Sequence, residues 1–249
     1  MPIQTTIQNA LLGALPASDR ALLEPYLETV RLGRGRVLVE AEGALGHAWF
    51  PQGCVVSCTI AMSDGRAVEA AMVGREGVVG GVMALGSRRP LARYVVLVEG
   101  AAARVTAERF EAAVARSLEL RRLCLGHVET VLAQALRLSA CHSLHSAEGR
   151  LCRWLLTVRD RAGADELRVT HEGLAETLGL ARPTVSLIAY RLQCAGLIAY
   201  RQGVLRVLDR DGLERGSCEC YAALRVLQDH VLSALPAPPS GLGDIRVRW

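Results

Sequence analysis

The stretch from residue 168 to residue 198, RVTHEGLAETLGLARPTVSLIAYRLQCAGLI, limits most strongly what this chain can fold into. Its pattern predicts two short helices joined by a tight turn. Thr170 is a suitable N-cap for the first helix, because its hydroxyl can accept a hydrogen bond from a first-turn amide. Gly179 can take the positive φ at which that helix ends, and Pro183 suits the first turn of the second helix. Gly196 is expected to end the second helix.

The second helix of this pair has an apolar and a polar face. The residues that recur at helical spacing and predict its buried face are Val185, Ile188, Ala189 and Leu192. This layout is typical of a helix-turn-helix whose second helix lies in the major groove of DNA. The residues expected to be exposed on it are Arg182, Thr184, Ser186, Tyr190 and Arg191. Such side chains can reach base edges or phosphates. The alternative is an ordinary helical hairpin within another α-helical domain.

Length and composition exclude several classes of protein. The 249 residues allow one large domain or two modest ones, and a hydrophobic share of 51% excludes a disordered chain. Because no uninterrupted apolar run reaches about 18 residues, we expect no membrane-spanning helix and no membrane partner. The N-terminus lacks the pattern of an export signal, so we expect a cytoplasmic protein. The net charge of +4 is by itself a weak indication of nucleic-acid binding.

Residues 30–106 predict β-structure. The β-prone runs are RLGRGRVLVE, HAWFPQGCVVSCTIAM, RAVEAAMV, ARYVVLVEG and AAARVTA. Asp64-Gly65, between two of these runs, is a strong hairpin signal. Several short strands at this spacing predict a sandwich or a barrel.

Residues 107–146 are free of proline and rich in helix formers, which predicts one long central helix. One apolar stripe has steps of three and four residues and consists of Leu120, Leu123, Cys124, Val128, Val131, Ala135 and Leu138. A second apolar face consists of Leu125, Leu132 and Leu136. One face can pack on the barrel of the chain and the other on a twin helix, so we predict a homodimer. The alternative is a single buried helix in a monomer.

Shorter elements flank these regions. Residues 7–15 and 18–27 predict two short helices ahead of the strands. Ser146 is expected to open a helix ahead of the helix-turn-helix. After it, LIAYRQGVLRVLDRDGL predicts a two-stranded wing with Gly203 at its tip, and residues 218–232 predict a last helix.

A barrel, a long central helix and a winged helix-turn-helix, in this order, resemble the Crp/Fnr family of bacterial transcription regulators. The most specific segments are VTHEGLAETLGLARPTVSLIAYRLQCAGLI and MVGREGVVGG, and further likeness lies in RLCRWLL and VLDRDGLERGSCECY. The resemblance implies an α+β fold with an N-terminal jelly-roll barrel. It divides the chain into a cyclic-nucleotide-binding-like sensor domain at 1–106, a dimerisation helix at 107–146 and a winged helix-turn-helix domain at 147–230. Residues 231–249 are rich in proline and glycine and cannot pack a core, so we expect a flexible tail there.

The resemblance also implies partners and DNA contacts. It implies a homodimer on a two-fold site in double-stranded DNA, with RNA polymerase as a further partner. Arg182 matches the arginine of the recognition helix in this family. The residues that match positions meeting phosphates are Thr170, His171 and Thr184. The acidic residue that often follows the arginine is Pro183 here, and a second base-reading position is Leu187. We therefore expect sparse direct readout, with DNA shape carrying more of the specificity.

The effector region departs further from the family. Cyclic-nucleotide binders carry a carboxylate just after a glycine of this loop and then an Arg-Ser or Arg-Thr pair. Here Gly80 is followed by Gly81, and no hydroxyl residue directly follows an arginine of SRRPLARY. The residues that the resemblance places at an effector pocket are Gly80, Gly81, Arg88, Arg89 and Arg93. We expect no cyclic AMP binding through this cassette, and we expect the glycines to serve tight turns.

Cysteine and histidine near residue 141 suggest a metal site. Cys141 and His145 are four residues apart on one helix face, and both can bind zinc or haem iron. The alternative is a helix end at which His145 and Ser146 form hydrogen bonds with the start of the next helix. We assign this second role and predict neither a metal nor a cofactor.

The remaining paired cysteines are also assigned as structural. Cys54 and Cys58 share one face of a strand, where a redox role competes with that of a small buried hydrophobe. Cys218 and Cys220 cannot face one ligand together unless the last helix breaks.

These observations predict a transcription regulator without catalytic activity, whose effector is not cyclic AMP or which has none. The sequence contains no nucleophile elbow, phosphate loop or HExxH pair, which argues against an enzyme. The alternative function is a ligand-sensing or redox-sensing module, based on cysteine and histidine, with weak or lost DNA binding.

Overall fold

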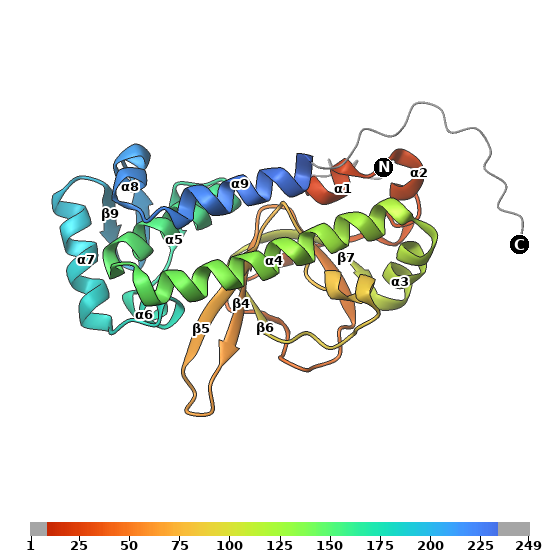
Figure 1. Cartoon of the computed structure of the whole chain (residues 1–249), viewed down its shortest axis with the longest axis horizontal. Helices are drawn as coiled ribbons and strands as arrows, with labels where there is room; N and C mark the ends of the chain where they lie inside the picture. Colours follow the sequence, from red (N-terminus) through yellow and green to blue (C-terminus); the bar gives the residue numbers. More distant parts are fainter. Residues whose placement is uncertain (1–8, 234–249) are drawn as a thin grey trace, which may run out of the picture.

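The strands between residues 28 and 106 form two antiparallel sheets of a barrel-like domain. The computed structural model describes residues 9–233 and places this domain beside a long helix and a smaller helical domain (Figure 1). One sheet has the strand order β1-β7-β3 and the other β2-β6-β4-β5. The strands are β1 (Glu28–Leu32), β2 (Val37–Val39), β3 (His47–Pro51), β4 (Val55–Ala61), β5 (Ala67–Val73), β6 (Arg93–Val98) and β7 (Gly100–Thr106). The predicted barrel and the fold class are confirmed.

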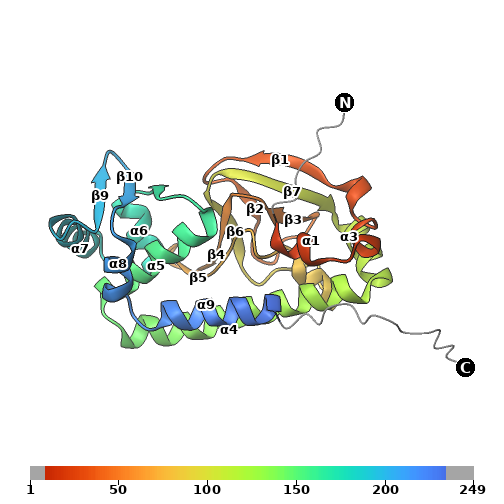
Figure 2. The ribbon, with the colours of Figure 1, turned by 90° about the horizontal axis from the view of Figure 1, so that it is seen from above.

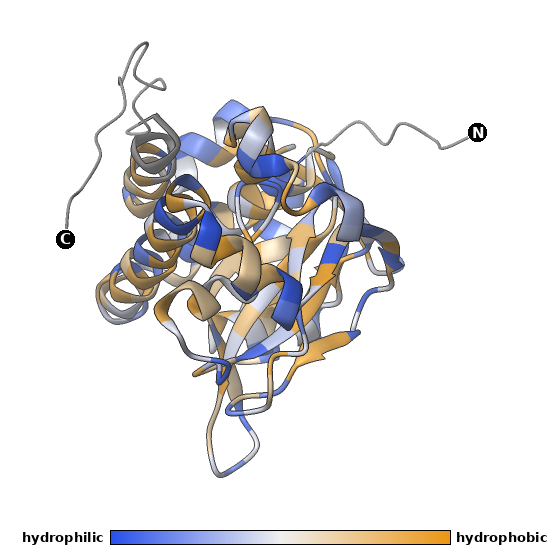
Figure 3. Ribbon diagram, turned by 90° about the vertical axis from the view of Figure 1, so that its right-hand side faces the viewer, coloured by the Kyte–Doolittle hydropathy of each residue, from blue (hydrophilic) through white to orange (hydrophobic). Residues whose placement is uncertain are grey.

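The hairpin predicted at Asp64-Gly65 joins β4 to β5, which pair antiparallel. Gly65 has a φ of 84°, which a residue with a side chain rarely adopts. The Asp64 carboxylate accepts a hydrogen bond from the Arg66 amide at 3.0 Å. Figure 1 shows this hairpin projecting from the barrel, and Figure 3 shows hydrophobic residues along the barrel strands and the helices beside them.

The N-terminal helices differ from the prediction. They are α1 (Ala10–Ala14) and α2 (Ala17–Arg20), followed by the 3₁₀ turn η1 (Glu24–Tyr26). The expected helix over residues 18–27 is wrong, because the chain turns after Ala21 and Pro25 has no N–H for a continuing helix. A further 3₁₀ turn, η2 (Gly81–Leu85), lies between β5 and β6.

The central region is two helices and not one. α3 (Ala107–Arg116) and α4 (Leu118–Leu144) are separated at Ser117, whose φ of −120° and ψ of 108° are not helical. The Ser117 hydroxyl accepts a hydrogen bond from the Leu120 amide at 2.9 Å and caps α4. Serine competes in this way with the helical backbone, which explains why the predicted continuous helix breaks.

The two faces of α4 have different surroundings. The residues buried on its inner face are Leu120, Leu123, Cys124, His127, Thr130, Gln134, Leu138 and Cys141. Three of these are polar and were absent from the predicted stripe. Of the predicted second face, Leu132 is 59% and Leu136 66% exposed, whereas Leu125 is half-buried and packs against the core of the barrel. Val131 packs partly against the barrel.

The C-terminal domain contains the expected helix-turn-helix and wing, together with one strand and one helix that were not predicted. Its elements are α5 (Ala147–Ala162), β8 (Glu166–Arg168), α6 (His171–Leu178), α7 (Arg182–Cys194), β9 (Ile198–Arg201), β10 (Val204–Val207), α8 (Arg210–Gly216) and α9 (Cys220–Ser233). The predicted wing is the β9–β10 hairpin, with positive φ at Gln202 and Gly203. Its predicted extent to Leu213 is wrong, because the Asp209 carboxylate accepts a hydrogen bond from the Gly212 amide at 2.8 Å and caps α8 there. β8 was not predicted and pairs with β10.

The last helix begins at Cys220, so the prediction of a helix from Cys218 is wrong. α8 ends at Gly216, and Ser217 and Cys218 precede the first turn of α9. α9 then runs beside α4 (Figure 2). The proposed flexible tail lies outside the described residues from position 234 onward. Within residues 9–233, no helix combines the length and the apolar character that a membrane span requires.

A buried ionic network connects the barrel, α4 and α5. Arg161 of α5 donates from Nε to Glu76 Oε1 at 2.8 Å and from Nη2 to Gln134 Oε1 at 3.1 Å. Both members of the ion pair are at most 5% exposed. Gly74 allows this approach, because a Cβ there would lie 2.7 Å from Glu76 Oε2 and 2.8 Å from Arg161 Cβ. The network fixes the end of α5 against the barrel.

Candidate nucleic-acid interface

The helix-turn-helix has the local geometry that the sequence predicts. The Thr170 hydroxyl accepts a hydrogen bond from the Gly173 amide at 3.0 Å and caps α6. Gly179 ends α6 with a φ of 60°. α7 begins at Arg182, with Pro183 in its first turn. The residues buried on its inner face are Val185, Ile188, Ala189 and Leu192, as predicted.

The outer face of α7 is polar and exposed. Arg182, Thr184, Tyr190 and Arg191 are all exposed, and Ser186 is half-buried. Arg182 Nε lies 3.5 Å from Glu172 Oε2, and Arg191 Nη1 lies 3.9 Å from Glu148 Oε2. Exposed pairs of this kind contribute little free energy. Both guanidinium groups can therefore exchange these carboxylates for phosphates or base edges.

His171 and Ser186, which the sequence analysis placed among the DNA contacts, contact each other. His171 Nδ1 and Ser186 Oγ are 2.9 Å apart, and the imidazole stacks on Tyr200 with ring centroids 4.4 Å apart. Burial and the positive charge of Arg182 lower the pKa of His171. Tyr200 lies on the wing and donates its hydroxyl to the Val169 carbonyl at 3.0 Å. These contacts fix α6, α7 and the wing as one surface.

Comparison with known proteins identifies the class of this domain. Residues 149–216 match the Crp-like helix-turn-helix domain. The transcriptional regulator LdrP of Thermus thermophilus is 33% identical over 132 residues, which cover 47% of this chain and 67% of that protein. The chain belongs to the Crp/Fnr family of transcription regulators.

Solved structures share the fold of this Crp/Fnr protein at low identity. A Crp/Fnr-family regulator from Eubacterium rectale has a TM-score of 0.64 and 18% identity, over 82% of this chain and 96% of that one. FixK2 of Bradyrhizobium japonicum has a TM-score of 0.64 and 16% identity, over 77% of this chain and 98% of that one. The family consists of transcription regulators and not of enzymes.

The barrel of this Crp/Fnr protein contacts its helix-turn-helix. A cleft of about 670 Å³ lies between the β4–β5 hairpin and the turn from α6 to α7. Its lining includes Arg66 and Val68 from the barrel and Glu172 and Arg182 from the helix-turn-helix. A Cβ at Gly179 would lie 3.7 Å from Val68 Cγ2, which is ordinary packing distance. The start of α7 is therefore next to a barrel hairpin.

The five residues assigned to an effector pocket do not gather around one cavity. Arg88 forms ion pairs with Glu108 at 2.9 Å and with Glu111 at 2.5 Å, both on α3. Arg93 pairs with Glu40 at 3.0 Å, and Arg89 is exposed.

The glycines of this region have a structural role. Gly80 has a φ of 94° and caps η2. A Cβ at Gly81 would lie 3.7 Å from Val128 Cγ2 of α4, so this glycine faces the long helix. Gly80 thus serves a tight turn, as expected. In cyclic-nucleotide binders the acidic residue of this loop occupies the position of Gly81, which packs on α4 here.

The strand cysteines have the environment of small hydrophobes. Cys54 and Cys58 are buried, and burial raises the pKa of each thiol to about 11. Thiols with so high a pKa carry almost no thiolate near neutral pH, which makes them poor nucleophiles.

Proposed function

We propose that this Crp/Fnr protein binds a two-fold operator as a homodimer, with α7 of each protomer in a major groove. The observation that carries the proposal is the division of α7 into a buried apolar face and an exposed polar face with an arginine at its N-terminal end. The recognition helices of such a dimer read half-sites about 34 Å apart.

The exposed face of α4 supports the dimer. Leu132 and Leu136 are one helical turn apart and lie on the side of α4 that the barrel does not cover. A second α4 packed against this side would bury both side chains. Such burial contributes about 25 cal/mol of favourable free energy per Å² of apolar surface. Because Val131 already packs on the barrel, it is less suited than Leu132 or Leu136 to a test of this interface.

The division of labour follows the order of the domains. Residues 1–106 form the sensor domain, 107–146 contain the dimerisation helix, and 147–230 bind DNA. The effector is not cyclic AMP, or there is none. This rests on Gly81 in the position of the ribose carboxylate and on the engagement of Arg88 by two glutamates.

Arg182→Ala tests the DNA interface. If Arg182 forms a bidentate contact with guanine, the substitution should cost about 1–3 kcal/mol per half-site and relax selection at one base position. If it meets only phosphate, affinity should fall for all sequences, and the salt slope should decrease by roughly 0.9 per lost contact.

Selection from randomised DNA at two salt concentrations separates these two results. Arg116→Ala is the matched control, because Arg116 is an exposed arginine at the end of α3, away from the winged domain. Unchanged affinity and an unchanged selection profile for Arg182→Ala would show that α7 does not enter the groove.

A further inference from the structure

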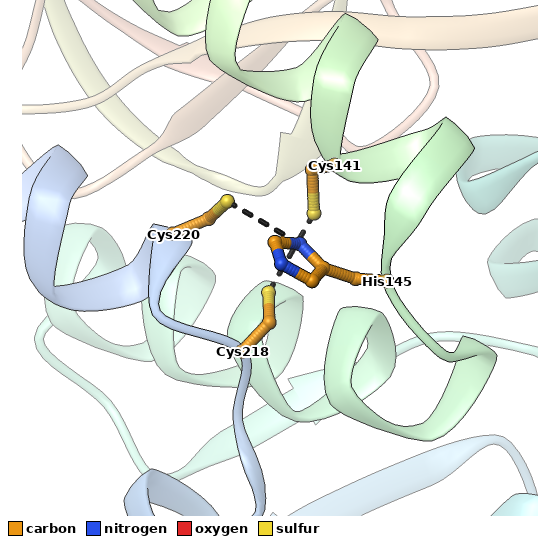
Figure 4. A group of neighbouring side chains, drawn as sticks. All are labelled: Cys141, His145, Cys218 and Cys220. Atoms are coloured by element: carbon orange, nitrogen blue, oxygen red, sulfur yellow. Dashed lines mark hydrogen bonds between the residues drawn. The ribbon is translucent and has the colours of Figure 1, made fainter.

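Four potential metal ligands from distant parts of the sequence meet at the end of α4. Cys141 and His145 come from α4 and its C-cap, Cys218 comes from the loop between α8 and α9, and Cys220 is the first residue of α9 (Figure 4). One ligand atom from each residue lies within 4.8 Å of the others. Cys141 Sγ is 3.5 Å from Cys218 Sγ, and Cys220 Sγ is 3.6 Å from His145 Nδ1.

Local structure brings each pair of residues to this point. Cys141 and His145 are four residues apart, and the His145 amide donates to the Cys141 carbonyl at 3.1 Å in the last turn. Because α9 begins only at Cys220, the Cys218 thiol is not constrained by helical geometry and points toward the same centre as the Cys220 thiol. The break that the sequence analysis required for joint binding is present.

The loop that carries Cys218 is held close to α5. The Cys218 amide donates to the Gly149 carbonyl at 3.3 Å. A Cβ at Gly149 would lie 3.3 Å from Cys218 N and 3.5 Å from Cys218 Cβ. The first of these contacts is tight and the second is ordinary packing distance, so a glycine at this position of α5 eases the approach of the loop to the end of α4.

We propose that Cys141, His145, Cys218 and Cys220 bind one zinc ion. Three cysteines and one histidine are a recurrent ligand set of structural zinc sites. A tetrahedron with Zn–S bonds of about 2.3 Å has sulfur–sulfur edges of about 3.8 Å, close to the separations of these atoms. Iron–sulfur clusters contain several metal ions and bridging sulfides, and hold their ligands farther apart. The cluster geometry therefore selects a single ion.

The surroundings of the four ligands suit a zinc–thiolate centre. His145 Nε2 lies 4.0 Å from Glu219 Oε1, and metal-bound histidines commonly donate their second ring N–H to a carboxylate. Zinc with three thiolates carries net negative charge, and the buried guanidinium groups of Arg150 and Arg153 are near the cysteines. Burial raises the pKa of the Cys141 and Cys218 thiols, while the positive charge of Arg153 lowers it.

The position of the site gives the ion a mechanical role. The chain leaves α4 at Leu144, forms the winged domain from α5 to α8, and returns to α4 at Cys218. Zinc therefore joins the two ends of the winged domain to the end of α4. Arg150 extends this connection, because it donates to the His142 carbonyl of α4 and to the Leu178 carbonyl at the end of α6. The ion fixes the winged domain relative to the long helix.

Zinc binding is measured on the reduced, full-length protein. The metal-free chain is titrated with Zn²⁺ in competition with a chromophoric chelator, and with Co²⁺ while the absorption spectrum is recorded. We expect one ion per chain and a Co²⁺ spectrum typical of tetrahedral thiolate coordination. Cys218→Ser should lower the zinc affinity at least about 100-fold, and Glu219→Gln should lower it by up to about tenfold.

The matched control is Cys194→Ser, because Cys194 is an exposed cysteine outside the cluster. It should bind zinc like the unmodified chain. Circular dichroism of Cys218→Ser against the metal-free parent establishes that the variant is folded. The proposal is overturned by no zinc binding at micromolar concentration, by equal binding by Cys218→Ser and Cys194→Ser, or by an iron–sulfur spectrum after anaerobic purification. A Cys141–Cys218 disulfide that persists in reducing buffer would overturn the proposal as well.

The proposed metal site and the proposed DNA interface are tested by independent measurements. Zinc binding is measured without DNA, so its presence or absence does not depend on the proposed operator. The mechanical role rests on the proposed function. It predicts that removal of zinc lowers the operator affinity of the parent, and that removal of zinc leaves the operator affinity of Cys218→Ser unchanged. Equal operator affinity with and without zinc would overturn the mechanical role alone.

Discussion

The two ends of α5 carry buried arginines that are balanced in different ways. Near its C-terminal end, Arg161 is paired with Glu76 of the barrel and with Gln134 of α4. Near its N-terminal end, Arg150 and Arg153 are also buried, but among the described residues no carboxylate lies within ion-pair distance of either. Arg150 donates to backbone carbonyls, and Arg153 is close to the cysteine cluster.

This difference supports the proposed zinc site. A buried charge is costly unless it is paired and hydrogen-bonded. The protein itself supplies the counter-charge for Arg161. The positive charge of Arg153 also lowers the pKa of the buried Glu69 carboxyl, and the proposed zinc–thiolate centre adds negative charge near both Arg150 and Arg153. We call the contacts of Arg161 the first junction and the surroundings of Arg150 and Arg153 the second. The first junction is therefore independent of zinc, whereas the second depends on metal and on reduced thiols.

The largest effect is expected for Arg161→Ala. The substitution leaves Glu76 buried without its partner and should lower the free energy of unfolding by about 3–5 kcal/mol. Urea denaturation measures the loss, which should be the same with zinc and with chelator. Arg122→Ala is the control, because Arg122 pairs with Glu119 on the exposed surface of α4. A loss that zinc reverses would contradict the independence of the two junctions.

A smaller, pH-dependent effect is expected for Glu69→Gln. Glu69 of β5 accepts hydrogen bonds from Ser57 Oγ at 2.6 Å and from Trp154 Nε1 of α5 at 3.0 Å. Burial raises its pKa to about 7 from the ordinary value of 4.5. Between these pH values the folded state keeps a proton that the unfolded state has lost, so ionisation of Glu69 lowers stability as pH rises.

Glutamine does not ionise, so Glu69→Gln should gain stability relative to the parent between pH 4.5 and pH 7, by on the order of 3 kcal/mol at the upper end. Thermal unfolding across this range provides the measurement. Glu99→Gln, at an exposed carboxylate, should follow the parent. A constant difference between Glu69→Gln and the parent at all pH values would show that Glu69 does not titrate in this window.

The smallest effect on protomer stability is expected for Leu132→Glu and Leu136→Glu. Both residues lie away from the junctions, so the free energy of unfolding of the protomer should change by only about 0.5 kcal/mol. Dimerisation should weaken at least tenfold, because charge is placed in an apolar seam. Sedimentation velocity measures this, with Leu91→Glu, 88% exposed on the barrel, as control. A parent chain that sediments as a monomer at micromolar concentration would rule out the dimer.

Sequence reasoning succeeded where the relevant contacts are local. The N-cap at Thr170, the left-handed Gly179 and the hairpin at Gly65 each depend on residues within one or two turns of chain. It failed at Ser117, where helix-forming composition outweighed a single capping serine. It also missed the polar residues on the inner face of α4, since hydrophobic spacing cannot register a buried His127 or Gln134.

The sequence by itself determined the order of the domains, the helix-turn-helix and the exposed polar face of α7, because periodicity and capping are properties of neighbouring residues. Only the tertiary structure decided that His171 and Ser186 contact each other and that Cys141 meets Cys218, 77 residues away. Gly216 and Ser217, directly ahead of Cys218, indicate a break before the last helix. They do not indicate which side chains the Cys218 thiol contacts. Such long-range contacts depend on how whole helices and strands pack, which no local sequence pattern predicts.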